Sequence, residues 1–204
     1  MNNQTVRQFV PGPAGAIECA VDAPSAPERG VAVICHPHPQ HGGTMDNKVV
    51  QTLARAFVQL GYRAVRFNFR GIGGSAGHWD EGRGEVDDAL AVVAALRDPA
   101  LPLALGGFSF GAYVTTQAAA RLPDGAKAQR LVLVGPAVVN FPALPVSQDS
   151  LVIHGEADDV VPLSAVLDWA RPQVLPVTVV PATGHFFHGQ LPLLRQIVVN
   201  AWQG

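Results

Sequence analysis

The chain carries six short runs of apolar residues in which hydrophobic and polar positions do not alternate. They occupy residues 30–35, 64–69, 101–106, 131–134, 151–154 and 177–181. Unbroken apolar runs of this length are typical of strands that are covered on both faces, as in the parallel sheets of α/β proteins. The runs therefore predict the strands of a mostly parallel sheet.

Between these runs, hydrophobic residues recur with the spacing of an amphipathic helix. In residues 46–60 they fall on one helical face, and Gly61 follows at a position where helices commonly end. Three further segments predict helices: one containing Val86, Leu90, Val93 and Leu96, one from Phe110 to Leu122, and residues 191–202. Strands that alternate with helices indicate an open, doubly wound α/β sheet.

The first twenty-odd residues, with a turn at 11–15, predict an antiparallel hairpin at the sheet edge. The length of 204 residues is that of one domain, and the sequence contains no repeat or linker. We therefore expect a single domain spanning residues 1–204.

Composition narrows the class of protein. Apolar residues make up 48% and charged residues 15%, which argues against disorder. A net charge of −2 gives no electrostatic reason to expect nucleic acid or an anionic membrane as partner. The N-terminus lacks the apolar stretch of a signal peptide, so we expect a cytoplasmic protein in which Cys19 and Cys35 are free, buried thiols. The oligomeric state stays open, a homodimer included.

Ser109 is the candidate nucleophile. It lies in Gly107–Phe108–Ser109–Phe110–Gly111, directly after a predicted strand and before a predicted helix. Glycines two positions before and after a serine allow the sharp strand-to-helix turn that exposes the side chain at the sheet edge. The serine would also lie at a helix N-terminus, whose dipole favours developing negative charge.

A serine hydroxyl needs a base to take its proton, and the base needs a carboxylate to orient it. His185 follows the last predicted strand after Gly184, and Asp158 follows the strand predicted at 151–154. We predict that these two residues are the base and the acid. The neighbouring alternatives are His188 for the base, and Glu156 and Asp159 for the acid; a solvated acidic turn is the other interpretation of this segment.

Three other stretches suggest chemistry that their details argue against. His36, His38 and His41 alternate with prolines, lack the helical spacing of a zinc pair and have no cysteine or acid beside them, so we predict no metal site. The glycine-rich residues 70–77 lack the Lys-Ser/Thr ending of a phosphate loop, and we expect them to wall the active site instead. The acidic residues between 80 and 88 are interpreted as a solvent-exposed helix start.

Together these motifs resemble those of the α/β-hydrolase superfamily along nearly the whole chain. Residues 36–48, 67–71 and 107–111 are similar to segments of its small lidless bacterial serine hydrolases. The resemblance implies the α/β-hydrolase fold, hydrolysis of an ester or related acyl bond, no cofactor, and Ser109, Asp158 and His185 as the catalytic triad. Pro37 departs from the commoner pattern, in which a glycine follows the histidine. Only the sixteen residues 135–150 separate the sixth and seventh predicted strands, too few for an inserted domain, so no lid is expected and the site should be open to water.

In such a fold, one oxyanion donor is the N–H of the residue after the nucleophile, here Phe110. The other comes from the loop after the third strand. Pro37 and Pro39 have no N–H, so His38 is the predicted second donor and Gln40 the alternative. The residues predicted to contact substrate are His36, Gln40 and Arg70.

These observations predict a carboxylesterase-like serine hydrolase that cleaves a small ester or thioester through an acyl-enzyme on Ser109. The expected partner is a small-molecule acyl substrate, without nucleic acid or membrane. A non-catalytic ligand-binding relative of the same fold and a peptidase are the alternatives. Carbon–carbon or carbon–halogen chemistry is a further one, although dehalogenases usually carry aspartate in place of the serine.

Overall fold

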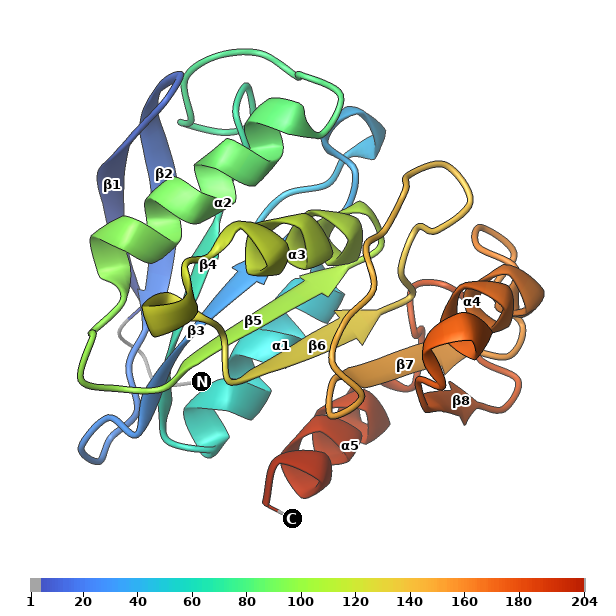
Figure 1. Ribbon diagram of the computed structural model, residues 1–204. Helices are drawn as coiled ribbons and strands as arrows, with labels where there is room; N and C mark the ends of the chain where they lie inside the picture. Colours follow the sequence, from blue (N-terminus) through green and yellow to red (C-terminus); the bar gives the residue numbers. More distant parts are fainter. Residues whose placement is uncertain (1–4, 204) are drawn as a thin grey trace.

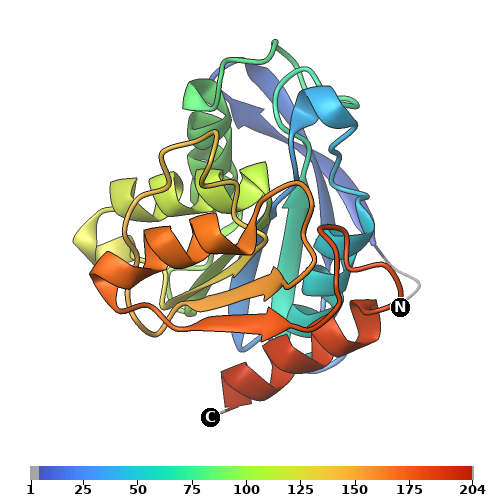
Figure 2. The ribbon, with the colours of Figure 1, turned by 90° about the vertical axis from the view of Figure 1, so that its right-hand side faces the viewer.

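Eight strands form one sheet in the order β1-β2-β4-β3-β5-β6-β7-β8 in the computed structural model, which describes residues 5–203 (Figures 1 and 2). The strands are β1 Val6–Gly12, β2 Gly15–Asp22, β3 Gly30–Cys35, β4 Tyr62–Phe67, β5 Leu103–Phe108, β6 Arg130–Val134, β7 Leu151–Gly155 and β8 Val177–Val180. From β4 to β8 all neighbours pair in parallel, whereas β1–β2 and β2–β4 are antiparallel. The predicted edge hairpin and mostly parallel sheet are confirmed.

Helices cover both faces of this sheet, and Figure 1 shows α2 and α3 in front of it. The helices are α1 Lys48–Gln59, α2 Arg83–Leu96, α3 Phe110–Arg121, α4 Leu163–Ala170 and α5 Leu191–Gln203. Alternate residues of β3 face opposite layers: Ala32 and Ile34 pack in the core with α1 and α5, while Val31 and Val33 pack in the core with α2, α3 and α4. Fully buried strands with two apolar faces explain why these sequence runs do not alternate.

The element boundaries depart from the sequence pattern in three places. β5 covers 103–108, because Pro102 cannot donate to the ladder and the chain stays extended up to Ser109. β4 begins at Tyr62, directly after the positive-φ Gly61, and ends before 69. The short helix α4, which the hydrophobic pattern did not predict, follows Pro162 and buries Val166 and Ala170.

The connection from β6 to β7 contains no helix or strand, so the lidless architecture is confirmed. Both cysteines are free and buried as expected, and burial raises the pKa of each thiol to about 12. Within residues 5–203, no helix combines the length and the apolar character needed to cross a membrane. The glycine-rich segment 70–77 contacts the N-terminal hairpin: Ala76 N–H donates to the Ala16 carbonyl at 2.8 Å.

Candidate active site

Ser109 lies at the sharp turn between β5 and α3, at the carboxyl end of the sheet. Its backbone has φ 56° and ψ −119°, a conformation that non-glycine residues seldom adopt. A Cβ on Gly107 would overlap the Gly111 carbonyl, and a Cβ on Gly111 would overlap the Cys35 carbonyl. The two glycines therefore let three segments of backbone meet beneath the serine, as their spacing predicted.

Asp158 and His185 lie in the loops after β7 and β8 and contact each other directly. His185 Nδ1 is 2.7 Å from Asp158 Oδ2, and both side chains are almost completely buried. Asp158 Oδ1 accepts the backbone N–H groups of Val160 at 3.0 Å and Val161 at 2.8 Å. Burial alone would raise the pKa of Asp158, but the hydrogen bond from His185 and these amides hold it below its usual value.

The alternatives for these two positions face solvent. Glu156 is exposed, and its Oε2 accepts the Ala182 N–H at 2.9 Å. Asp159 and His188 are exposed as well. Of the titratable residues in these two loops, Asp158 and His185 are thus the pair that the structure brings together.

Contacts around Phe108 and β6 bring the histidine beside the serine. The ring of His185 lies on the ring of Phe108, which immediately precedes Ser109, with 4.8 Å between centroids. On the other side, Gly135 faces His185: a Cβ there would lie 3.2 Å from the imidazole Cε1. Ser109 N–H itself donates to the Val134 carbonyl at 2.9 Å. His185 therefore lies against the end of the strand that leads into Ser109.

The β3–α1 loop, residues 36–47, approaches the same point from the other side. It contains a short 3-10 turn, Pro39–His41, whose first amide, that of Gln40, donates to His38 Nδ1 at 3.2 Å. Among the described residues, the backbone N–H groups of His38 and Phe110 have no protein acceptor. Two free amides beside a serine are what an oxyanion hole requires.

Aromatic rings surround His38. Its imidazole lies 4.6 Å from the ring of Trp79, 5.2 Å from Phe110 and 5.8 Å from Phe141, with His41 also in contact at 4.6 Å. We refer to these five residues as the aromatic cage. Burial, and to a smaller extent His41, lower the pKa of His38 below its usual value.

Comparison with known proteins identifies the family. Residues 26–148 match the family model described as serine aminopeptidase, S33. A lidless α/β serine hydrolase from Xanthomonas campestris is 40% identical, with 100% of this chain and 95% of that one aligned and a TM-score of 0.88. The chain belongs to the α/β serine hydrolases.

Two other comparisons reach less far. An uncharacterized protein from Rickettsia prowazekii is 41% identical over 116 residues, which are 55% of this chain and 49%, about half, of that relative. An esterase from Pyrococcus furiosus aligns over 98% of this chain and 92% of its own, with a TM-score of 0.75 and 15% identity. This second likeness shows a shared fold alone.

In this α/β serine hydrolase, two of the three residues predicted to contact substrate have buried, internal partners. His36 is 0% exposed; its Nδ1 bonds the Pro37 carbonyl at 2.7 Å, and its Nε2 accepts the Phe69 N–H at 3.0 Å. Burial lowers the pKa of His36 to about 4, so the ring is neutral and fastens the β3–α1 loop to the end of β4. Substrate contact by this side chain therefore has no support in the structure.

Arg70 has a similar internal role. Its Nε and Nη2 donate to Asp88 at 3.0 and 2.8 Å, and Asp88 is itself 1% exposed. Nearby Glu85 is 0% exposed and accepts the N–H groups of Asp80 and Gly82. The interpretation of this acidic stretch as a solvated helix start is wrong for these two residues, because Asp88 pairs with Arg70 and Glu85 caps α2. Gln40, the third residue predicted to contact substrate, is exposed.

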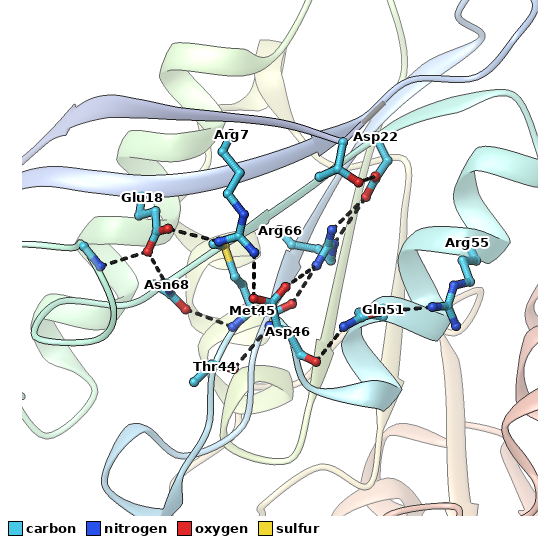
Figure 3. A network of polar contacts seen from close by, with 12 residues as sticks. Arg7, Glu18, Asp22, Thr44, Met45, Asp46, Gln51, Arg55, Arg66 and Asn68 are labelled. Carbon is cyan, nitrogen blue, oxygen red and sulfur yellow. Dashed lines mark hydrogen bonds and ion pairs between the residues drawn. The ribbon is translucent and has the colours of Figure 1, made fainter. Parts of the chain in front are cut away.

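A polar network fastens the far end of the β3–α1 loop to the sheet (Figure 3). Arg66, on β4 and 6% exposed, donates to the Met45 carbonyl at 3.0 Å and to Asp46 at 3.1 Å. Asn68 accepts the Met45 N–H at 2.9 Å. Other members drawn in Figure 3 are Arg7, Glu18, Asp22, Thr44, Gln51 and Arg55. Residues 44–48, which the sequence marked only by resemblance to known hydrolases, thus include the residues that attach the loop to β4.

The histidines of the β3–α1 loop contact other parts of the protein. Within the described residues, no group of three or more histidine, cysteine or acidic side chains is arranged to hold a metal ion. His36 instead bonds backbone groups, and His38 and His41 contact each other as rings.

Proposed function

We propose that this protein hydrolyses small esters or thioesters through an acyl-enzyme on Ser109. The observation that carries the proposal is the 2.7 Å contact between His185 Nδ1 and Asp158 Oδ2, made beside a serine held in a strained turn. A carboxylate bonded to Nδ1 holds the proton on that nitrogen and leaves Nε2 free to accept one.

The reaction follows from this arrangement. His185 Nε2 takes the hydroxyl proton as Ser109 Oγ attacks the acyl carbon, and the carbonyl oxygen becomes an oxyanion held by the amides of His38 and Phe110. His185 then gives the proton to the leaving alcohol or thiol, and the acyl group stays on Ser109. Water, deprotonated by the same imidazole, releases the acid and restores the serine. Asp158 stays ionised throughout, because it stabilises the imidazolium.

Two observations favour a small ester as the substrate. The connection from β6 to β7 forms no lid, and a site open to water suits a leaving group that departs without prolonged closure. The aromatic cage limits the space on the oxyanion side, which suits small acyl groups. The family model's description as a serine aminopeptidase makes peptide hydrolysis the second candidate, so the substrate panel must include it.

The test is intact-mass analysis after treatment with a fluorophosphonate. The wild-type protein and the Ser164→Ala control, which alters an exposed serine of α4, should each gain one adduct, and Ser109→Ala should gain none. Turnover of p-nitrophenyl acetate should fall at least about 10⁴-fold in Ser109→Ala. A folded wild-type protein that gains no adduct would refute the proposal and favour a ligand-binding role. Faster cleavage of alanine p-nitroanilide than of the ester would favour the peptidase.

A further inference from the structure

His154 is a buried histidine that the proposed reaction does not use. It lies in β7, four residues before Asp158, and its side chain is 0% exposed. A buried imidazole is costly to desolvate, and strand positions of this kind are usually filled by apolar residues. Its contacts must therefore explain its presence.

The ring bonds the loop that carries Asp158. His154 Nε2 is 2.9 Å from the Val161 carbonyl oxygen, and because a carbonyl can only accept, the ring proton lies on Nε2. The same nitrogen is 3.5 Å from Asp158 Oδ2, the oxygen that also bonds His185. Asp158 Oδ2 thus lies near two imidazole nitrogens, the bonded Nδ1 of His185 and, farther away, the protonated Nε2 of His154.

The other ring nitrogen of His154, Nδ1, makes no such contact, so the Nε2–H is the group that contributes. His154 Nδ1 is buried and has no hydrogen-bond partner among residues 5–203. With the proton on Nε2, this atom is an unsatisfied acceptor, which destabilises the fold relative to an apolar side chain of similar size. Burial is the main influence on the pKa of His154 and lowers it, so the ring is neutral and acts as a donor dipole.

We propose that His154 is a positioning residue for the acid: its Nε2–H holds the Asp158 loop at Val161 and directs a second dipole at Oδ2. This inference rests on the proposed function, in which Asp158 orients His185. Asp158 and His185 are the titratable groups that act on His154, and both belong to the candidate triad. Without the His154 N–H, less positive charge lies near the Asp158 carboxylate. The electrostatic potential at His185 would then be more negative.

The expected consequence is a rise in the pKa of His185. We compare His154→Leu, which keeps volume but no donor, with His154→Gln, whose side-chain N–H can still reach the Val161 carbonyl. His154→Leu should raise the His185 pKa by about half a unit or more, and His154→Gln should restore most of the difference. Val152→Ala is the matched control, because it loosens the packing of the same strand without touching an imidazole donor, and it should leave the His185 pKa unchanged.

The measurement is a pH titration of the ¹⁵N-histidine-labelled protein followed by NMR. In the wild type, His154 should carry its proton on Nε2. An unchanged His185 pKa in His154→Leu, a shift of equal size in Val152→Ala, or a wild-type His154 protonated on Nδ1 would each overturn the inference. The last result needs no variant, so the inference can be overturned even if His154→Leu does not fold.

This readout requires no turnover. A protein without a fluorophosphonate adduct would refute the proposed function, whereas the His185 titration would still decide whether His154 acts on Asp158. In an active protein, the acidic limb of the kcat/KM profile of His154→Leu should move to higher pH together with the NMR value.

Discussion

The two sides of the candidate site differ in charge: one is made of aromatic and imidazole rings, and the other contains an ionised carboxylate. On the oxyanion side, the β3–α1 loop is held by neutral imidazoles and aromatic rings, and the charged network of Arg66 and Asp46 lies farther along the loop. On the other side, the ionised Asp158 accepts three N–H groups, those of Val160, Val161 and His185, and His154 Nε2 lies 3.5 Å from its Oδ2.

This difference matches what each side would do in the proposed reaction. An oxyanion is stabilised by fixed dipoles, so a loop that keeps two amides in place serves it without a charge of its own. A proton-transfer pair needs a permanent negative charge, because the imidazolium that forms must be stabilised. The comparison therefore predicts that the charged side fails by loss of a charge and the neutral side by gain of one.

The largest expected effect is on the charged side. Asp158→Asn should lower kcat for p-nitrophenyl acetate by roughly 10⁴-fold, since an amide can hold the wrong tautomer of His185. Steady-state kinetics check this, with Asp159→Asn as the control because Asp159 is the exposed neighbour. If both variants keep wild-type activity, Asp158 does not orient the base.

Much of this side was predictable from the sequence because its signals are local. Ser109, Asp158 and His185 each follow a strand, and the glycines around Ser109 mark the turn by spacing alone. The hydrogen bonds that the sequence did not predict join positions far apart along the chain: Arg70 with Asp88, and His36 with Phe69. Nothing in the neighbouring residues indicates such partners, so the sequence alone did not predict that the side chains of His36 and Arg70 bond other parts of the protein.

The neutral side should weaken in acid through His36. Its pKa is about 4 in the folded protein and near 6.5 in an unfolded chain, so between these values only the unfolded state binds the proton. Stability from this group is complete above about pH 6.5 and is lost as the pH falls to about 4, a total of about 3 kcal/mol.

Urea unfolding measured across this pH window checks the effect. His36→Asn should be less stable at neutral pH and should lose that part of the pH dependence. His78→Asn, a change at an exposed histidine, should keep it. Equal slopes in the wild type and His36→Asn would mean that His36 is not held neutral by burial.

The smallest effect is expected at the aromatic cage. His38→Ala keeps the backbone amide but removes the ring that Trp79, Phe110 and Phe141 surround, so the donor loses its fixed position. We expect kcat to fall about tenfold with little change in KM, and His38→Phe to recover most of it. A loss as large as that of Asp158→Asn would instead indicate that the imidazole takes part in the chemistry.

The left-handed backbone at Ser109 has a consequence for how robust this enzyme fold can be. For a residue with a side chain, such a backbone conformation costs about 1–3 kcal/mol of folding free energy, whereas a glycine adopts it freely. A net stability of about 5–15 kcal/mol is usual for a folded protein, so one residue takes up a sizeable part of the margin. The strain at Ser109 thus lowers the stability that remains to absorb destabilising substitutions elsewhere in the chain.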